Sequence, residues 1–155
     1  MPFMVTSDAF SAGGAISSRF TCEGEDVSPP LAWSGAPLGV ASFALTVDDP
    51  DAPGGVFTHW VLYNLPATST RLPQGVPARQ RVVEGGLQGK NDFGRTGYDG
   101  PCPPPGRPHH YRFTLYALDA TLDLQAGAAE QDVLNAIRGH VLGQAQLVGT
   151  YQRQR

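Results

Sequence analysis

The chain has 155 residues, of which 41% are hydrophobic, and a formal net charge of −3 at pH 7. This length and composition predict one domain, residues 1–155, with a real buried core. The slight negative charge and the lack of any run of like charges argue against a nucleic-acid-binding surface and a polybasic membrane contact. The 19 glycines and 14 prolines favour a loop-rich β protein over a helix bundle.

The beginning of the chain and its cysteines bear on location. The first residues lack the basic and apolar regions of a secretory signal, and no later stretch is long and apolar enough to span a bilayer. A cytoplasmic location is therefore expected. Cys22 and Cys102 form no CxxC pair, which argues against a zinc ribbon or a thioredoxin motif. In a reducing compartment the two thiols are expected to stay free, with a disulfide as the less favoured alternative.

The first part of the chain reads as short strands and turns. Short strands around a turn are expected in residues 1–20, and another short strand in residues 31–33. Residues 42–48 alternate as a strand, and continuing the alternation places Asp49 and Asp51 on its apolar side, beyond the last hydrophobic residue. Two carboxylates at the end of an apolar face need partners. Pro50 and Pro53 close this strand, and a cis bond at either proline is an open possibility.

Four more segments follow before the C-terminus. Residues 56–65 are apolar on both faces, which predicts a central strand with His59, Val61, Tyr63 and Leu65 on one side. Residues 66–90 read as a loop with one edge strand around residues 81–83. Apolar residues at four-residue spacing predict a helix over residues 128–142, and a final strand is expected over residues 146–151.

A proline-rich loop, residues 97–108, leads into a strand over residues 109–118. Its five prolines fix φ, so the loop is expected to form a stiff wall. Strand alternation places His109 and Tyr111 on the apolar face and His110 on the other face. A small pocket is expected where the wall meets the start of this strand.

The polar residues at these strand ends predict one shared cavity. It would be lined by Asp49, Asp51, His59, His109 and Tyr111. Histidine and tyrosine side chains can donate hydrogen bonds to a small anion, and backbone N–H groups around Gly100 can form an oxyanion nest. The aspartates would orient the histidines or accept from a cationic group on the same ligand. A phosphoethanolamine headgroup satisfies both requirements.

Other interpretations of these residues stay open. His59 can be an ordinary hydrogen-bonded core histidine, the aspartates can be turn formers, and Tyr111 can be strand packing. Metal binding by His59, His109 and Asp49 would suit a metal-dependent hydrolase, although His109 and His110 point to opposite faces and only one of them can join His59. A serine hydrolase is disfavoured because no Gly-x-Ser-x-Gly elbow occurs. A protein-interaction or protease-inhibitor module with a vestigial pocket is a further alternative.

Two motifs resemble the signature blocks of the phosphatidylethanolamine-binding proteins, in the bacterial branch called Raf kinase inhibitor-like. The blocks are Asp49–Pro53 with His59-Trp60, and Gly97–Pro104 with His109–Phe113. The likeness covers nearly the whole chain. It implies a mainly antiparallel β-fold with a large central sheet, a smaller second sheet, a C-terminal helical segment and a small anion pocket.

The resemblance also implies which residues bind the ligand. Asp49, His59, Gly100, His109 and Tyr111 match the family's ligand-binding positions, and Asp51 and Pro101 adjoin them. It further implies a frequent homodimer and a protein partner, although the surfaces by which eukaryotic members inhibit kinases are not evident in this chain. We expect a non-enzymatic module without metal or cofactor that binds phosphate or a phospholipid headgroup and regulates a protein partner.

Overall fold

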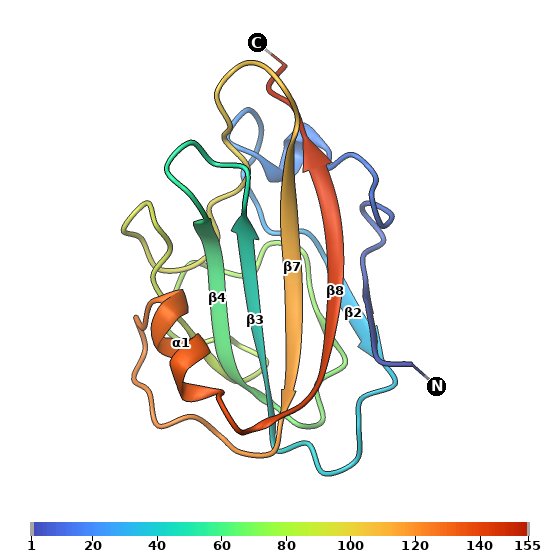
Figure 1. Cartoon of the computed structure of the whole chain (residues 1–155), viewed down its shortest axis with the longest axis vertical. Coiled ribbons are helices and arrows are strands. Elements are labelled where there is room, and N and C mark those ends of the chain that lie inside the picture. The colour runs from blue at the N-terminus through green and yellow to red at the C-terminus, as the bar shows by residue number, and fades with distance from the viewer. Residues whose placement is uncertain (1, 155) are drawn as a thin grey trace.

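The computed structural model describes residues 2–154, which form two antiparallel sheets and a short helix (Figure 1). The larger sheet has five strands in the order β6-β4-β3-β7-β8, and the smaller has three in the order β1-β2-β5. The larger sheet comprises β3 (Ser42–Asp49), β4 (Phe57–Pro66), β6 (Leu87–Gln88), β7 (His109–Leu118) and β8 (Val141–Tyr151). The smaller sheet comprises β1 (Met4–Thr6), β2 (Leu31–Ser34) and β5 (Arg71–Leu72). The predicted mainly-β fold with a large and a small sheet is confirmed.

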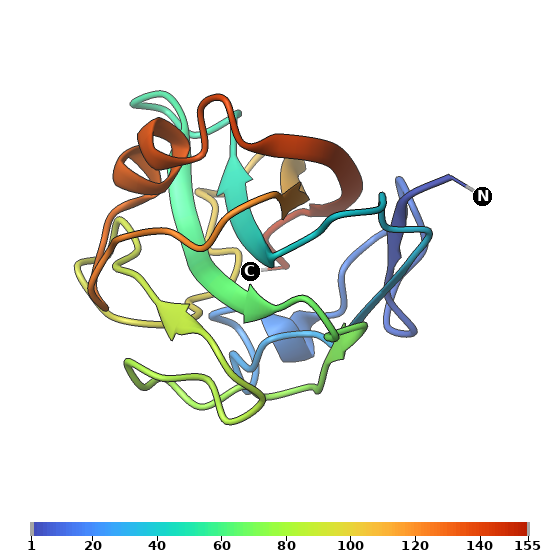
Figure 2. The same cartoon turned by 90° about the horizontal axis from the view of Figure 1, so that it is seen from below.

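The larger sheet forms the middle layer of the molecule. The view from below shows the smaller sheet on one side of it and α1 (Glu130–Ala136) on the other (Figure 2). Between the two sheets lies the larger hydrophobic cluster, to which Trp33, Phe43 and Phe113 contribute. A second cluster beneath α1 joins Val133 and Ile137 to Val61 and Tyr63 of β4. A short 3-10 helix, η1 (Ser18–Phe20), precedes β2.

Strand β3 is the central strand and sets the position of the site. All eight of its residues are buried, because β4 and β7 pair with it on either side and both faces are covered. Both pairings are antiparallel, so Asp49 lies opposite Phe57 and Asp48 lies opposite Arg112. The end of β3 and the beginnings of β4 and β7 therefore meet at one end of the sheet.

Helix α1 is much shorter than the periodicity predicts. The helix ends at Ala136, and β8 already begins at Val141, five residues before the expected strand. Gly139 has φ +80°, a left-handed conformation that glycine adopts without a steric penalty and that stops the helix. Val133 and Ile137 are buried as expected, but the next residue of the apolar stripe, Val141, pairs with Leu118 in the sheet.

The predicted face of His59 is also wrong. The pairing of β3 with β4 shifts by one residue between Val47–Trp60 and Asp48–Thr58, which is a β-bulge at His59. His59 thereby lies beside Tyr111, on the side of the sheet where Trp60 packs, and not on the side of Val61 and Tyr63. Regular alternation had placed it with the latter pair.

Two smaller expectations need correction, and the open possibility of a cis proline is resolved. Residues 66–90 contain two short strands, β5 and β6, and Arg81 forms only an isolated bridge to Leu87. No cis peptide bond occurs within residues 2–154, so Pro50 and Pro53 are trans. Cys22 and Cys102 are not free thiols but form a disulfide. In the described part of the chain, no helix is long and apolar enough to cross a membrane.

Candidate functional site

A small cavity of about 180 Å³ opens where β3 ends and β4 and β7 begin. The turn after β3, the loop that contains Phe93, and the proline-rich wall close its sides. Its lining residues are Asp49, Ala52, Pro53, Phe57, His59, Phe93, Cys102, Pro103, Pro104, His109 and Tyr111. The polar groups come from the strand ends, and the apolar groups come mostly from the surrounding loops.

His109 is held by Asp49 at the base of the cavity. The imidazole Nδ1 lies 2.6 Å from Oδ2 of Asp49, and both side chains are buried. The other carboxylate oxygen accepts a hydrogen bond from the backbone N–H of Asp51 at 2.7 Å. A proton on Nδ1 satisfies the carboxylate, so Nε2 of His109 remains for other contacts.

His59 is held by a backbone carbonyl. Its Nδ1 lies 2.7 Å from the carbonyl oxygen of Asp99, and its ring packs against Phe57, Phe93 and Tyr111. Burial lowers the pKa of His59 below its usual value, although nearby carboxylates and this hydrogen bond oppose the shift. The ring is therefore neutral near pH 7, with its proton on Nδ1.

Tyr111 adds a third polar side chain to the cavity, on β7 two residues after His109 and with its ring beside that of His59. Its hydroxyl is buried, and no described residue meets the geometry of a hydrogen bond with it, although the Asp49 carboxylate lies near enough to interact with it. Burial, and then the charge of Asp49, raise the pKa of Tyr111 well above its usual value, so the phenol stays protonated. A buried hydroxyl with no partner is uncommon in folded proteins and calls for an explanation.

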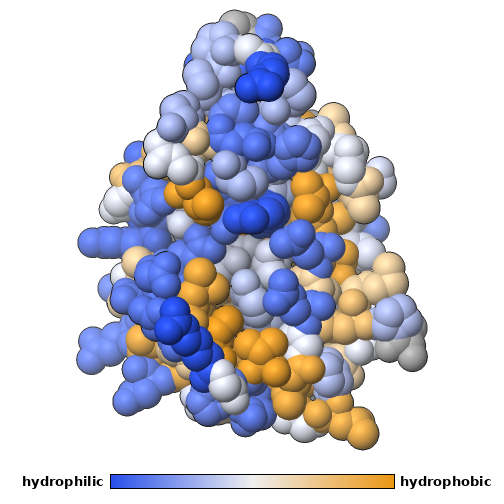
Figure 3. All heavy atoms as spheres, in the orientation of Figure 1, coloured by the Kyte–Doolittle hydropathy of each residue, from blue (hydrophilic) through white to orange (hydrophobic). Residues whose placement is uncertain are grey.

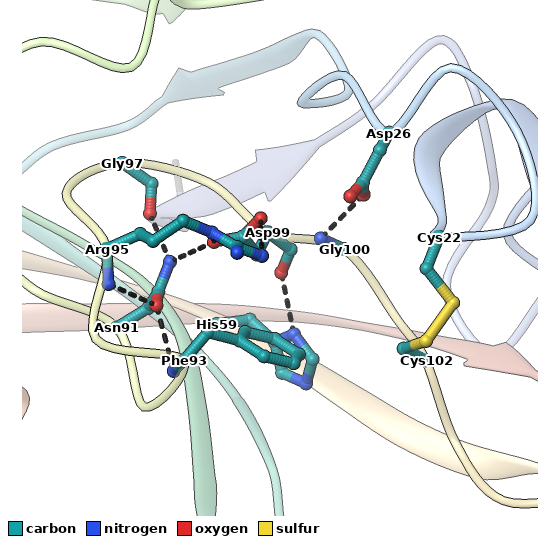
Figure 4. Close-up of polar contacts among 10 residues, drawn as sticks. All are labelled: Cys22, Asp26, His59, Asn91, Phe93, Arg95, Gly97, Asp99, Gly100 and Cys102. Atoms are coloured by element: carbon teal, nitrogen blue, oxygen red, sulfur yellow. Dashed lines mark hydrogen bonds and ion pairs between the residues drawn. A yellow bond between two sulfur atoms is a disulfide. The ribbon is translucent and has the colours of Figure 1, made fainter.

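A polar network behind His59 fixes the carbonyl that holds it (Figure 4). The side-chain amide of Asn91 donates to the carbonyl of Gly97 and to the carboxylate of Asp99, at 3.0 Å and 2.7 Å. Its oxygen accepts from the backbone N–H groups of Phe93 and Arg95. Arg95 also forms a two-point ion pair with Asp99, at 3.0 Å and 2.9 Å. The network orients the Asp99 carbonyl toward His59 and places Phe93 against the cavity.

The proline-rich wall is tied to the loop after η1. The disulfide joins Cys102 of the wall to Cys22, and the backbone N–H of Cys22 donates to the carbonyl of Pro101 at 3.1 Å. The N–H of Gly100 donates to the Asp26 carboxylate at 2.8 Å. A side chain at position 100 would collide with the Phe20 carbonyl oxygen, which lies 2.0 Å from the place of its Cβ. Glycine at this position therefore allows the close approach of the two loops.

The structure brings together four of the predicted site residues: Asp49, His59, His109 and Tyr111 all line the cavity. Asp51 does not line it. β3 ends at Asp49, and the Asp51 carboxylate instead pairs with Nδ1 of His110 on the outer surface, at 2.7 Å.

Gly100 and Pro101 belong to the wall but do not line the cavity either. The N–H of Gly100, which the sequence suggested for an oxyanion nest, is already bonded to Asp26. Sequence reasoning missed Phe93 and the Asn91 network. The Asn91–Gly94 segment is recognisable as a turn, and an asparagine at the start of a turn often bonds the backbone that follows it.

The described residues contain no group of three or more histidine, cysteine or acidic side chains placed to hold a metal ion. Asp49 is already engaged by His109 and by the backbone of Asp51. The arrangement instead offers an unpaired phenol and two imidazole Nε2 atoms around a partly apolar cavity, which suits hydrogen bonding to a small polar group.

The fold and the cavity define a two-sheet β protein with a small ligand-sized pocket at one end of its central strands. Residues 6–152 match the family model described as phosphatidylethanolamine-binding protein. The chain belongs to this family.

Relatives and solved structures agree with this assignment. A protein from Methanothermobacter thermautotrophicus is 55% identical over 94% of this chain and 95% of its own length. A Mycobacterium tuberculosis protein whose name describes a lipoprotein, LppC, is 44% identical over 97% of this chain and 73% of its own length. The crystal structure of Escherichia coli YbcL superposes with a TM-score of 0.91 and 36% identity, covering 99% of this chain and 100% of YbcL. That of the homologue CT736 from Chlamydia trachomatis gives 0.89 and 37%, covering 98% of each chain.

Proposed function

We propose that the protein binds a small oxyanion, such as phosphate or the phosphoethanolamine headgroup, in this cavity without converting it chemically. The observation that carries the proposal is the buried hydroxyl of Tyr111, which forms no well-aligned hydrogen bond within residues 2–154 and has only the Asp49 carboxylate nearby. An oxyanion in the cavity would accept this hydrogen bond and remove the cost of the unpaired group.

The histidines add two more contacts. In both His59 and His109 the Nδ1 atom is already bonded, to a carbonyl and to a carboxylate respectively. Nε2 of each ring is thus the atom left for a ligand. Phe57, Phe93 and Pro103 supply apolar walls, and exclusion of water strengthens polar contacts inside such a site.

Charge sets the expected pH dependence. No lysine or arginine is among the described residues that line the cavity, so an imidazolium must supply any positive charge. Protonated His109, paired with Asp49, can donate from Nε2 to an anion. We therefore expect the affinity for phosphoethanolamine to fall as the pH rises through the histidine range, and equal binding at pH 5 and pH 8 would remove this part of the mechanism.

A titration followed by histidine NMR resonances tests the proposal. Phosphoethanolamine should shift the ring resonances of His59 and His109 in a saturable manner. His109→Ala should abolish binding. The matched control is His140→Ala, because His140 also pairs with an aspartate, Asp119, but lies exposed and outside the cavity. If both cavity histidines ignore phosphoethanolamine and respond instead to stoichiometric zinc, the metal-dependent hydrolase is the better assignment.

We further propose that ligand binding regulates a protein partner, as the Raf kinase inhibitor-like label implies. A filled cavity would present the partner with a different surface from an empty one. Two observations weigh against the cytoplasmic location that was expected from the sequence. A disulfide between exposed cysteines persists best in an oxidising compartment. Together with the lipoprotein name of one relative, it favours a location outside the reducing cytoplasm.

A further inference from the structure

The hydrogen-bonding groups of the cavity include an acceptor as well as donors. A carbonyl oxygen can only accept, so the proton of neutral His59 must lie on the Nδ1 atom that faces Asp99. Nε2 of His59 then carries a lone pair. The phenol of Tyr111 stays protonated at ordinary pH, so its O–H is available to donate to a ligand oxygen.

The charged groups near His59 come from several elements, and none of them reverses this state. Asp49 of β3, Asp26 of the loop after η1 and Asp99 before the wall each favour an imidazolium, but burial outweighs them. Arg95 pairs with Asp99, and burial raises the pKa of Asp26. His59 therefore faces the cavity as a neutral acceptor.

The net charge of the cavity disfavours a dianion. Asp49 contributes a buried carboxylate, and protonated His109 can do no more than neutralise it. A doubly charged ligand would meet no further cation among the described lining residues, and an uncompensated buried charge is costly.

We infer that the cavity selects oxyanions that carry a proton, and so binds a monoprotonated phosphoryl group in preference to a sulfate ester or a phosphodiester. The inference rests on the proposed function and specifies its ligand. The P–OH group would donate to Nε2 of His59, while Tyr111 and His109 would donate to the other phosphoryl oxygens. Phosphomonoesters have a second pKa of about 6 and keep this proton in mildly acidic solution. Sulfate monoesters and phosphodiesters have no such proton.

The need for a proton on the ligand distinguishes free phosphate and phosphomonoesters from the phosphodiester of an intact phospholipid. Free phosphate and phosphoethanolamine are available as protonated monoanions. The phosphate of an intact phospholipid is a diester and would leave the lone pair of His59 unpaired. A site built to bond a ligand hydroxyl rejects an analogue that lacks it more strongly than a purely apolar site does.

Calorimetric titration with ethyl phosphate and ethyl sulfate at pH 5.5 tests the inference. At this pH the two esters are close in shape and in charge and differ by one proton. Ethyl phosphate should bind at least about tenfold more tightly, as the loss of one buried hydrogen bond implies. In a parallel pair, phosphoethanolamine should bind more tightly than glycerophosphoethanolamine. Equal affinity for ethyl phosphate and ethyl sulfate would overturn the inference while leaving the proposed oxyanion site intact.

A variant and a spectroscopic readout attribute the preference to His59. His59→Phe keeps a planar ring but removes the acceptor, and should reduce the preference for ethyl phosphate to less than about threefold. His140→Ala should keep the full preference. In the wild-type protein saturated with ethyl phosphate, ¹⁵N resonances should show His59 neutral and protonated on Nδ1. An imidazolium at His59 in this complex would overturn the inference even if the variant does not fold. If neither ester binds, the proposed function itself fails, and the inference with it.

Discussion

The single residue on which the account depends most is Tyr111. An unpaired buried hydroxyl costs about 1–3 kcal/mol, and this one lies beside a cavity that Asp49, His59 and His109 also line. Strand alternation located Tyr111 and His109 correctly because β7 keeps a regular register with β8 from His109 to Ala117. It could not locate His59, because one bulge residue turns a side chain to the other face.

Replacement of Tyr111 by phenylalanine should therefore have opposite effects on stability and binding. We expect Tyr111→Phe to leave the ligand-free protein equally stable or more stable by about 1 kcal/mol, and to weaken phosphoethanolamine binding at least about tenfold. Urea denaturation and calorimetry measure the two quantities. Tyr63→Phe is the matched control, since its hydroxyl bonds the Gln125 carbonyl and the Ala128 N–H far from the cavity. It should lose stability and keep binding. A Tyr111→Phe variant that is less stable yet binds normally would show that the hydroxyl has a structural partner instead.

At the scale of elements, the strands that carry the site also carry a buried polar cluster on their other face. Asp48, Thr58 and Arg112 are the sequence neighbours of Asp49, His59 and Tyr111. The Glu130 side chain of α1 contacts Thr58 and Asp48. Arg112 donates to Asp48 at 2.7 Å, and Thr58 donates to Glu130. This cluster joins the first turn of α1 to all three strands. Periodicity predicted that a helix covers this region but not where it ends, because the left-handed Gly139 is not visible in an apolar pattern.

Glu130 should make the stability of the protein depend on pH. Burial, and then its interaction with Asp48, raise the pKa of Glu130 to about 8. Between pH 4.5 and 8 the folded state then binds more protons at this group than the unfolded state does, so its contribution to stability falls as the pH rises. The lowered pKa of His59 acts in the opposite direction at the acid end of this window.

The comparison of Glu130→Gln with the wild type isolates the Glu130 contribution. The variant should gain stability relative to the wild type by on the order of 2 kcal/mol between pH 5 and pH 8, measured by urea denaturation at both values. Asp132→Asn, in the same helical turn but exposed, should show no such change. A constant difference between Glu130→Gln and the wild type at both pH values would contradict the assignment.

At the scale of the whole molecule, the disulfide joins the loop after η1 to the wall at the end that holds the site. The expected reducing compartment favoured free thiols. The two cysteines lie 80 residues apart in sequence, and only the fold brings their Cα atoms to 5.4 Å. The arrangement of two sheets was predictable through the family resemblance, whereas this link depends on contacts between the loop after η1 and the wall.

The end of the molecule opposite the site is more hydrophobic on its surface. Hydrophobic atoms gather over the lower part of the view in Figure 3. At this end β7 finishes and β8 begins, with Val141 and Leu142 half-exposed. A homodimer stays a prediction.

Loss of the disulfide should destabilise the whole fold. The double variant Cys22→Ser/Cys102→Ser should unfold with a free energy lower by about 2–4 kcal/mol, because the unfolded chain gains the entropy of a long open loop. Urea denaturation of the wild-type protein with and without a reductant should give the same difference. The double variant should not respond to the reductant. An unchanged unfolding midpoint for the reduced wild-type protein would show that the hydrogen bonds of Asp26 and Pro101 suffice to hold the wall.

A crystal structure of the protein grown with phosphoethanolamine tests the central claim most directly. The account predicts a phosphoryl group in the cavity, with one oxygen within hydrogen-bond distance of the Tyr111 hydroxyl and others within reach of Nε2 of His59 and of His109. A phosphoryl group bound elsewhere on the molecule, with the Tyr111 hydroxyl still unpaired beside an empty cavity, would contradict it.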